Sequence, residues 1–267
     1  MHPAPEISII ITAGSGTTAL RPAIDSIGDF AACEILVVAE RDTPAPRPDP
    51  RLMTLRAPGH GPNAARNLAL AVARAPLVAF LNPADRWRPG KLATQMMAHA
   101  ARSDVGMSFT DHMLLGSQRQ NHGSVLDLAG GFGMRHAGRS LPFALGEDAL
   151  AQLFAEDIVG LSTVMAQTAL LRDSGGFDPG LGAAAPWDAW LRLSTMAPVV
   201  CVPWVLAEQR LPSLARQRQE AATRLSAMRE VARRHRNAVL CQDVAALRDC
   251  TARLLVSEAD LSAPVMN

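Results

Sequence analysis

The 267-residue sequence contains no tyrosine, and aromatic residues make up only 4% of it. Proteins that bind single-stranded nucleic acid usually stack bases on aromatic side chains, so this composition argues against such a role. Charge of one sign is also lacking, because 26 Lys and Arg residues against 25 Asp and Glu residues leave a formal net charge of +1. Without a global field to attract phosphate or anionic lipid, we expect neither nucleic acid nor a membrane surface as a partner.

The sequence also lacks a paired cysteine motif and a long hydrophobic run. Its four cysteines are scattered, with no CxxC spacing: Cys33, Cys201, Cys241 and Cys250. This pattern predicts small buried apolar groups or free thiols rather than a disulfide framework or a zinc site. The apolar run near the N-terminus follows no basic segment and is far too short to cross a bilayer, and no later stretch reaches that length. We therefore expect a cytoplasmic protein without a transmembrane segment.

The first 104 residues do contain a clear alternation of β-branched runs and helical spacings. Strands are expected at 6–16, 33–42, 51–57 and 76–82, and helices at 17–28, 61–75 and 88–103. This order is typical of a mostly parallel α/β sheet with helices on both faces. Such sheets bind ligands at the carboxyl ends of their strands, so the segments "TAGSG", "AERD" and "NPADRW" are expected to face one crevice.

The second half of the chain is less regular. We expect a strand at 105–115, an irregular stretch at 116–150, a strand, a helix and a Gly-Gly turn within 156–178, a helix at 186–196 and a strand at 198–210. A basic helix at 216–236, interpreted as a solvated face, and a final helix to about 255 complete the chain. No internal repeat or low-complexity linker is present, which favours one continuous domain.

Four short segments carry a resemblance to a known family. They are "AARN" (64–67), "AFLNPADRWRPGKL" (79–92), "GGFD" (175–178) and "WDAWLRLS" (187–194). Their combination, order and spacing resemble the inverting glycosyltransferases of family 2, which have the GT-A fold. The resemblance covers roughly residues 6–215. It implies a GT-A domain at 1–215, with a nucleotide half at about 1–104 and an acceptor half at about 105–215, and a helical extension at 216–267 packed on it.

Enzymes of that family transfer a sugar from a nucleotide diphosphate donor to an acceptor hydroxyl with inversion. The resemblance places the nucleotide contacts at Thr12, Ala13, Glu40, Arg66 and Asn82. Arg66 is the best of these, because a guanidinium matches phosphate oxygens, although a structural ion pair is the alternative. The two aspartates usual at the end of the family's second strand are replaced here by Ala39 and Glu40.

The family's metal-binding loop is altered in this sequence. Its aspartates align with Asn82 and Ala84, and the position expected to contact the cation directly is Ala84. Asp85 is retained, and we interpret it as a turn residue or a helix N-cap. A neutral amide is a poor sole ligand for Mg²⁺ or Mn²⁺, so no metal ligand is assigned. Mn²⁺ or Mg²⁺ would be a cofactor only if this altered loop still binds it.

The expected catalytic base is replaced as well. The family's acidic pair before the last motif corresponds to Ala185-Pro186, which leaves Asp188 as the nearest candidate for a catalytic base. The alternative for Asp188 is a structural acid near a helix N-terminus. Trp187 is a candidate for the acceptor groove, with core packing as its alternative. Asp111 matches a common family position and is expected to order a turn.

Two functional hypotheses remain open. The first is a transferase with a remodelled site, in which an acid from the irregular middle supplies a base or a metal ligand; the candidates are Glu147, Asp148, Glu156 and Asp157. The second is a catalytically inactive relative that binds a sugar or a nucleotide, or serves as a protein partner of a transferase. Replacement of the metal and base positions together favours the second, since losing a general base alone costs about 10²–10⁴ in rate.

Overall fold

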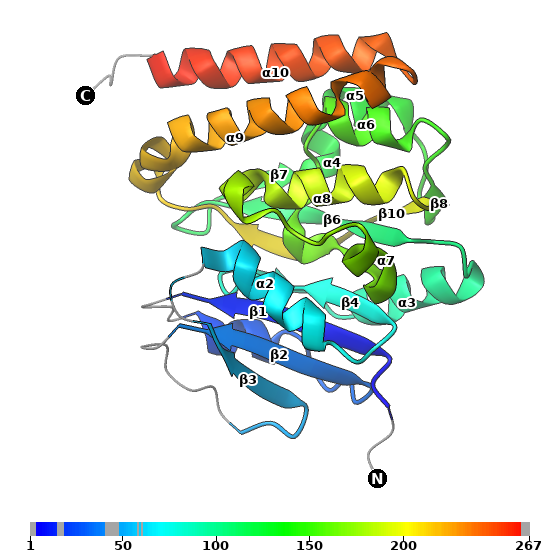
Figure 1. Ribbon diagram of the computed structural model, residues 1–267, viewed down its shortest axis with the longest axis vertical. Helices are drawn as coiled ribbons and strands as arrows, with labels where there is room; N and C mark the ends of the chain where they lie inside the picture. The colour runs from blue at the N-terminus through cyan, green and yellow to red at the C-terminus, as the bar shows by residue number, and fades with distance from the viewer. Residues whose placement is uncertain (1–3, 15–18, 41–47, 58, 60, 263–267) are drawn as a thin grey trace.

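A ten-stranded sheet forms the centre of the computed structural model, which describes residues 4–14, 19–40, 48–57, 59 and 61–262 (Figure 1). Eight of the strands follow the order β3-β2-β1-β4-β9-β6-β10-β5, while β7 pairs with β6 and β8 pairs with β10. The longer pairings are parallel and the short ones antiparallel, so the predicted mostly parallel α/β sheet is confirmed.

The first half of the chain supplies four neighbouring parallel strands, namely β1 (Ile7–Ala13), β2 (Cys33–Ala39), β3 (Leu52–Arg56) and β4 (Leu77–Phe80). β1 and β2 are buried on both faces, which explains why each is a continuous apolar run rather than an alternating one. Of the two predicted strands at 6–16 and 33–42, the ends at 15–16 and 41–42 lie outside the described residues.

The second half adds the two longest strands, β6 (Met107–Leu115) and β10 (Val199–Arg210), which pair in parallel. β9 (Met165–Gln167) runs antiparallel to both β4 and β6. The remaining short strands are β5 (Arg86–Trp87), β7 (Asn121–Ser124) and β8 (Phe143–Ala144). Because β9 opposes both of its neighbours, β1 to β4, β6 and β10 all point the same way, and their carboxyl ends lie at one edge.

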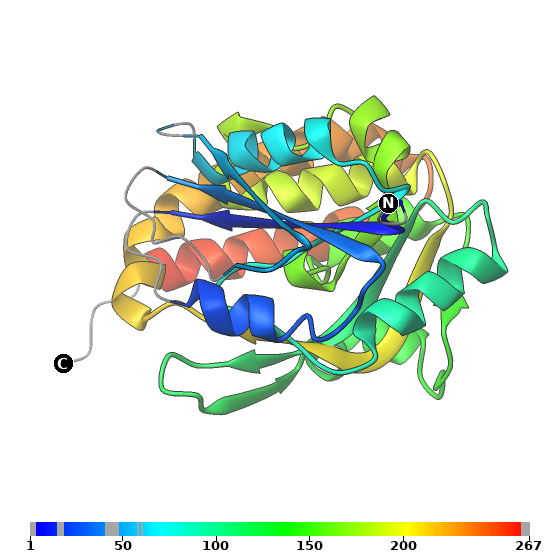
Figure 2. The same cartoon turned by 90° about the horizontal axis from the view of Figure 1, so that it is seen from below.

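Helices cover both faces of the sheet, as Figure 2 shows. α1 (Leu20–Asp25) and α3 (Lys91–Ala101) lie on one face, and α2 (Gly61–Val72) and α8 (Ala185–Ser194) on the other. Successive side chains of β1 point to opposite faces of the sheet. Ile9 packs in one hydrophobic core with Leu20 of α1, and Ile10 packs in a second core with Leu70 of α2.

The stretch expected to be irregular, 116–150, is more ordered than its composition suggests. It contains α4 (Val125–Leu128), α5 (Gly130–Arg135) and the first residues of α6 (Ala149–Ala155). α6 is buried nearly along its whole length, because α8, α9 and α10 surround it. Its apolar run is too short to show a helical period. The remaining elements are α7 (Thr168–Asp173) and the 3₁₀ helices η1 (Leu161–Thr163) and η2 (Pro179–Ala184).

Two long helices, α9 (Leu214–Leu240) and α10 (Val244–Ser262), pack against each other and against the rest of the chain. Figure 1 shows them in orange and red beside α6 and α8. α9 is exposed over most of its length and buries one stripe: Leu225, Met228, Val231, His235 and Val239. Across the described ranges, no helix is both long enough and apolar enough to cross a bilayer.

Candidate functional site

The carboxyl ends of the parallel strands bring together several of the predicted nucleotide contacts. Thr12 and Ala13 end β1, and Glu40 follows β2 directly. The backbone N–H of Glu40 donates to the carbonyl of Ala13 at 3.1 Å, so the two strand ends are joined. Arg56, at the end of β3, donates to the carbonyl of Glu40 at 2.8 Å. These residues lie at the edge of the sheet where the alternation of elements predicts a crevice.

Arg66 on α2 lies buried beside this edge. Its Nη1 donates to Oδ1 of Asn63 at 2.6 Å, and its Nη2 donates to Oδ1 of Asn82 at 3.5 Å. In the described part of the chain, no carboxylate oxygen lies within 4.0 Å of the guanidinium. Burial lowers the pKa of Arg66 to about 10, which still leaves the group charged at neutral pH. The structural ion pair considered for Arg66 is therefore not formed within these residues.

The segment "GGFD" fixes the aromatic ring beside Arg66. The Phe177 ring centroid lies 5.8 Å from the guanidinium carbon of Arg66. The neighbouring Asn67 holds the Phe177 backbone with two hydrogen bonds, of 2.7 and 2.9 Å. Gly176 has φ of +65°, and a Cβ there would lie 2.6 Å from Oδ1 of Asn67. The segments "AARN" and "GGFD" thus contact each other, and this contact positions the buried guanidinium of Arg66.

The loop after β4 is held by the carboxylate of Asp85, which is buried. Its Oδ2 accepts hydrogen bonds from the Ser162 hydroxyl at 2.6 Å and from Asn82 Nδ2 at 3.2 Å, and its Oδ1 accepts from the backbone N–H of Arg210 at 3.0 Å. Burial raises the pKa of Asp85 despite these bonds. Asp85 therefore shapes the turn, while the residue before α3 is Gly90.

The side chains around this loop do not provide the oxygen ligands that a divalent cation needs. Both oxygens of Asp85 are engaged within the protein, and Ala84, where the resemblance expects a ligand, is exposed and offers a methyl group. The Oδ1 of Asn82 faces the Arg66 guanidinium. Among the described residues, no three His, Cys, Asp or Glu side chains gather as a metal-binding group. A cation at this loop would lack the carboxylates that Mg²⁺ and Mn²⁺ prefer.

At the position of the expected catalytic base, Ala185 begins α8 and is fully buried, and Pro186 follows it, so neither residue offers a carboxylate. Asp188, one turn further along, is buried and directed to other partners. Its Oδ1 lies 3.0 Å from Nε2 of His235, and its Oδ2 accepts from Nε of Arg192 at 2.9 Å. These contacts favour the structural interpretation of Asp188 over that of a base facing an acceptor.

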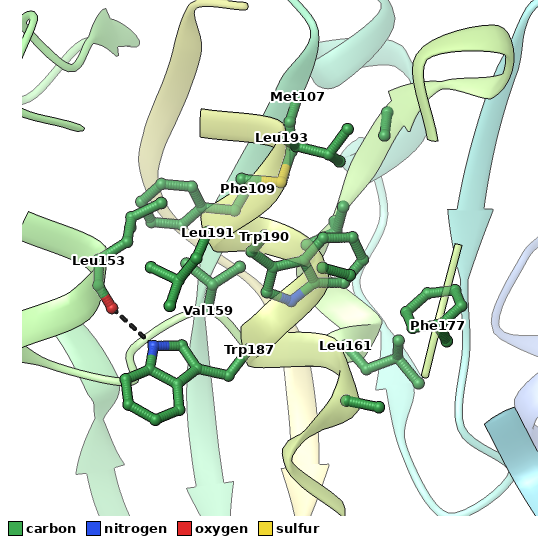
Figure 3. Close-up of a cluster of buried hydrophobic side chains, with 14 of the residues drawn as sticks. Met107, Phe109, Leu153, Val159, Leu161, Phe177, Trp187, Trp190, Leu191 and Leu193 are labelled. Atoms are coloured by element: carbon green, nitrogen blue, oxygen red, sulfur yellow. Dashed lines mark hydrogen bonds between the residues drawn. The ribbon is translucent and has the colours of Figure 1, made fainter. Parts of the chain in front are cut away.

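Trp187 and Trp190 lie in the core, where Figure 3 shows them among aliphatic side chains. Trp187 donates its indole N–H to the carbonyl of Leu153 at 2.9 Å, and its ring lies 5.8 Å from that of Phe154. Trp190 is fully buried and packs at 6.0 Å against the Phe80 ring. This arrangement favours core packing over an acceptor-groove role for Trp187.

The acids proposed as substitutes have other contacts or lie around α6. Asp148 pairs with Arg135 at 2.6 Å. The carboxylate of Glu156 accepts from two backbone N–H groups at the start of α5. Glu147 is exposed before α6, and Asp157 follows that helix. Asp111 accepts from the backbone N–H groups of His112 and Leu126, and so it orders the start of α4.

Three residues of the site are not indicated by any sequence pattern. Asn63 reaches the carbonyl of Gly182 at 2.7 Å and thereby joins α2 to η2. Ser162 donates to Asp85 from 77 residues away in sequence. Arg210 ends β10, and its buried Nε has no hydrogen-bond partner among the described residues. The one available signal for Arg210 is its position, since it ends a strand predicted to reach the same edge.

No protein-family model matches the sequence, and no curated protein sequence matches it. Solved structures do match. The mannosyltransferase PcManGT of Pyrobaculum calidifontis, in complex with GDP-Man and Mn²⁺, has a TM-score of 0.63 at 17% identity, over 98% of this chain and 77% of that chain. TarS 1–349 of S. aureus has a TM-score of 0.60 at 15% identity, over 85% of this chain.

TarS 1–349 also matches as its complex with UDP-GlcNAc, with a TM-score of 0.57 at 14% identity over 86% of this chain and 72% of that chain. The alignment with TarS 1–349 alone spans 64% of that chain. Identities this low establish the fold and not the activity. The chain has a glycosyltransferase fold of the GT-A type, which confirms the predicted fold class.

Proposed function

We propose that this chain is a glycosyltransferase-like protein of family 2 that binds a nucleotide-activated sugar in the crevice at the carboxyl ends of its strands. The GT-A fold supports this, because two structural neighbours are complexes with UDP-GlcNAc and with GDP-Man. The nucleotide would lie against Thr12, Ala13 and Glu40, with its phosphates toward Arg66 and Asn82.

The observation that carries the proposal is the buried guanidinium of Arg66. A buried cation without a carboxylate partner is unfavourable, because water no longer solvates it and no fixed charge replaces that water. Here the guanidinium keeps two amide oxygens and the face of Phe177. A phosphate at this edge would complete the pairing with charge-assisted hydrogen bonds. The lack of a carboxylate partner among the described residues supports a ligand phosphate as the counterion of Arg66.

Binding is better supported than conventional transfer. Inverting transfer needs neutralisation of the departing diphosphate and a base for the acceptor hydroxyl. The methyl groups of Ala84 and Ala185 can supply neither, and Asp188 is engaged by His235 and Arg192. The first candidate is thus a transferase with a remodelled site, and the second is a non-catalytic binding subunit. The second is supported by alanine at the positions of both the cation ligand and the catalytic base, Ala84 and Ala185.

A thermal-shift panel with UDP, GDP, CDP and dTDP, each with Mn²⁺ or with chelator, tests the proposal. A nucleotide at about 100 times its Kd should add roughly 2.7 kcal/mol to the free energy of unfolding. We expect one nucleotide to raise the melting temperature strongly and the others weakly. If none of the four stabilises the chain at millimolar concentration, the proposed binding function is wrong.

A turnover assay separates the two candidates. The preferred nucleotide sugar is incubated with the protein, with water as the acceptor of the sugar, and release of the nucleoside diphosphate is followed by chromatography. We expect no release above a protein-free control, in keeping with a binding role. Release that disappears in Arg66→Gln, with Arg102→Gln as the matched surface control, would identify an active transferase and overturn the non-catalytic candidate.

A further inference from the structure

A cavity of about 210 Å³ lies beside the altered metal loop, at the same edge of the sheet as Arg66. It is enclosed by side chains from four separate parts of the chain: Pro22, Ala84, Arg86, Leu115, Arg119, Glu208 and Arg210. Three of these seven residues are arginines, and one is acidic. Ala84, which replaces the expected cation ligand, forms part of the wall.

The single acid of the cavity does not neutralise the three arginines. Glu208 pairs with Arg88, whose Nη2 lies 3.1 Å from Oε1 of that glutamate. In residues 4–262, apart from the undescribed gaps, neither Arg86, Arg119 nor Arg210 has a carboxylate oxygen within 4.0 Å. The lining therefore carries more positive than negative charge, and the charges of Asp85 and Asp25 act on Arg86 without forming an ion pair with it.

Arg210 is the residue that points most directly to a counterion here. Asp85 accepts a hydrogen bond from its backbone N–H, which fixes the position of its Cα. Its Nε is buried and finds no acceptor among the described residues, which is unfavourable for a charged donor. An acceptor in the cavity would satisfy this Nε once the side chain turns toward it.

Arg86 and Arg119 add to this field from two other segments. Arg86 anchors one guanidinium nitrogen on the backbone carbonyls of Pro83 and Asp85, which holds the group at the rim of the loop. Burial and the neighbouring charge of Arg210 lower the pKa of Arg86. Arg119 lies at a tight turn after β6 with φ of +66°. The charges of Arg119 and Arg210 both act on Arg86, and such like charges repel unless an anion lies between them.

We propose that Arg86, Arg119 and Arg210 bind the diphosphate of the donor and take the place of the divalent cation, so that binding in this crevice is independent of metal. The proposal rests on the proposed nucleotide-sugar function. Guanidinium groups can meet phosphate oxygens through paired hydrogen bonds, a geometry that suits a diphosphate. Three such groups also supply the charge neutralisation that the missing carboxylate-bound cation would otherwise provide.

The test measures binding of inorganic pyrophosphate by calorimetry in the presence of a chelator, at low and at high salt. We expect binding by the unaltered chain that weakens with salt and does not improve when Mn²⁺ replaces the chelator. Arg119→Asn, which suits the positive φ, and Arg210→Gln should each raise the Kd about tenfold or more. The matched control is Arg102→Gln, which alters an exposed arginine at the end of α3 and should leave the Kd unchanged.

The same experiment with the preferred nucleotide separates this proposal from the proposed function. If nucleotide binding requires Mn²⁺ and its Kd is unchanged in Arg119→Asn and Arg210→Gln, the arginine proposal is wrong and the proposed nucleotide function remains supported. Pyrophosphate binding that depends on these arginines, with no response to any nucleotide, would support the anion site and overturn the proposed function. Absence of pyrophosphate binding in chelator would overturn the arginine proposal outright.

Discussion

The carboxylate of Asp188 on α8 lies 3.0 Å from Nε2 of His235 on α9. This contact spans 47 residues of sequence and joins α8 to the long C-terminal helix α9. Arg192 engages the other oxygen at 2.9 Å, and Asp178 is bound by Arg234 on α9 at 2.7 Å. The acid nearest to the expected catalytic base is thus part of the attachment of α9.

Replacing Asp188 should lower stability. Breaking a buried charge pair leaves its partners without a counterion, so we expect Asp188→Asn to cost about 3 kcal/mol in the free energy of unfolding. Urea denaturation measures this. The control is Asp173→Asn, at an exposed acid, which should change the free energy by less than about 0.5 kcal/mol.

The pH dependence of Asp188 sharpens this prediction. Burial opposes ionisation, but the hydrogen bond from His235 and the charge of Arg192 outweigh it and lower the pKa of Asp188. The stabilisation is therefore present above the unfolded pKa of about 3.9 and is lost as the pH falls through the lower folded value. In Asp188→Asn, the free energy of unfolding should therefore fall less steeply at acid pH than in the unaltered chain. An unchanged decline together with unchanged stability would contradict the structural role.

Lys91, the only lysine in the sequence, gives a second pH-dependent prediction. It is buried, donates to Gln95 at 2.6 Å, and lies 4.4 Å from the Trp87 ring centroid. Burial lowers its pKa to about 7. The unfolded chain then binds more protons than the folded chain above that pH, so stability should rise with pH toward the unfolded pKa of about 10.4.

The window to measure is pH 7.5 to 8.5, where no tyrosine is present to titrate. The buried thiols of Cys33, Cys201 and Cys250, whose pKa values burial raises, lower the stability of both proteins across this window, so the comparison with Lys91→Met isolates the lysine. We expect the difference in free energy of unfolding between the unaltered chain and Lys91→Met to rise by about 1 kcal/mol across this window. Urea denaturation at several pH values provides the comparison. An equal rise in both proteins would show that another group carries the dependence.

The sequence predicts the sheet well because periodicity is a local property. The continuous apolar residues of β1 and β2 predict strands, and the helical spacing of apolar residues in α2 predicts a helix, each from one segment alone. The parallel order of the strands then places Thr12, Ala13 and Glu40 at one edge of the sheet. Asp85 is likewise predictable as a turn residue from its neighbours. Helix α6 is missed because surrounding helices, rather than a periodic pattern, account for its burial.

The side-chain partners are not predictable in the same way. His235 reaches Asp188 from a helix whose sequence indicates only a basic, solvated surface. Arg86, Arg119 and Arg210 come from three separate segments, and no spacing in the sequence marks them as neighbours. These residues meet because β10 pairs with β6 on one side and with β5, which holds Arg86, on the other, and this register depends on the whole sheet.

Restoring a carboxylate at Ala84 should create the metal dependence that the present loop does not support. Ala84 is exposed and lines the cavity that contains Arg86, Arg119 and Arg210, so an aspartate fits there without displacing the core. We expect Ala84→Asp to weaken nucleotide binding in chelator, since the new charge pairs with the arginines, and to make binding stronger with Mn²⁺. Calorimetry with and without Mn²⁺ measures both effects.

Ala84→Asn serves as the control for that substitution, because it adds similar volume without charge. It should leave binding in chelator within about twofold of the unaltered chain and confer no response to Mn²⁺. Equal behaviour of the aspartate and asparagine variants would show that this loop lies too far from the bound phosphates to hold a cation for them.

The most direct test of the account is the affinity of Arg66→Gln for the preferred nucleoside diphosphate, measured by calorimetry beside Arg102→Gln. The melting temperature of each variant without ligand checks that it is folded. We predict that Arg66→Gln raises the Kd about tenfold or more, because a charge-assisted contact to phosphate is lost, while Arg102→Gln leaves it unchanged. A folded Arg66→Gln with the affinity of the unaltered chain would contradict the claim that the buried guanidinium is held in place for a nucleotide.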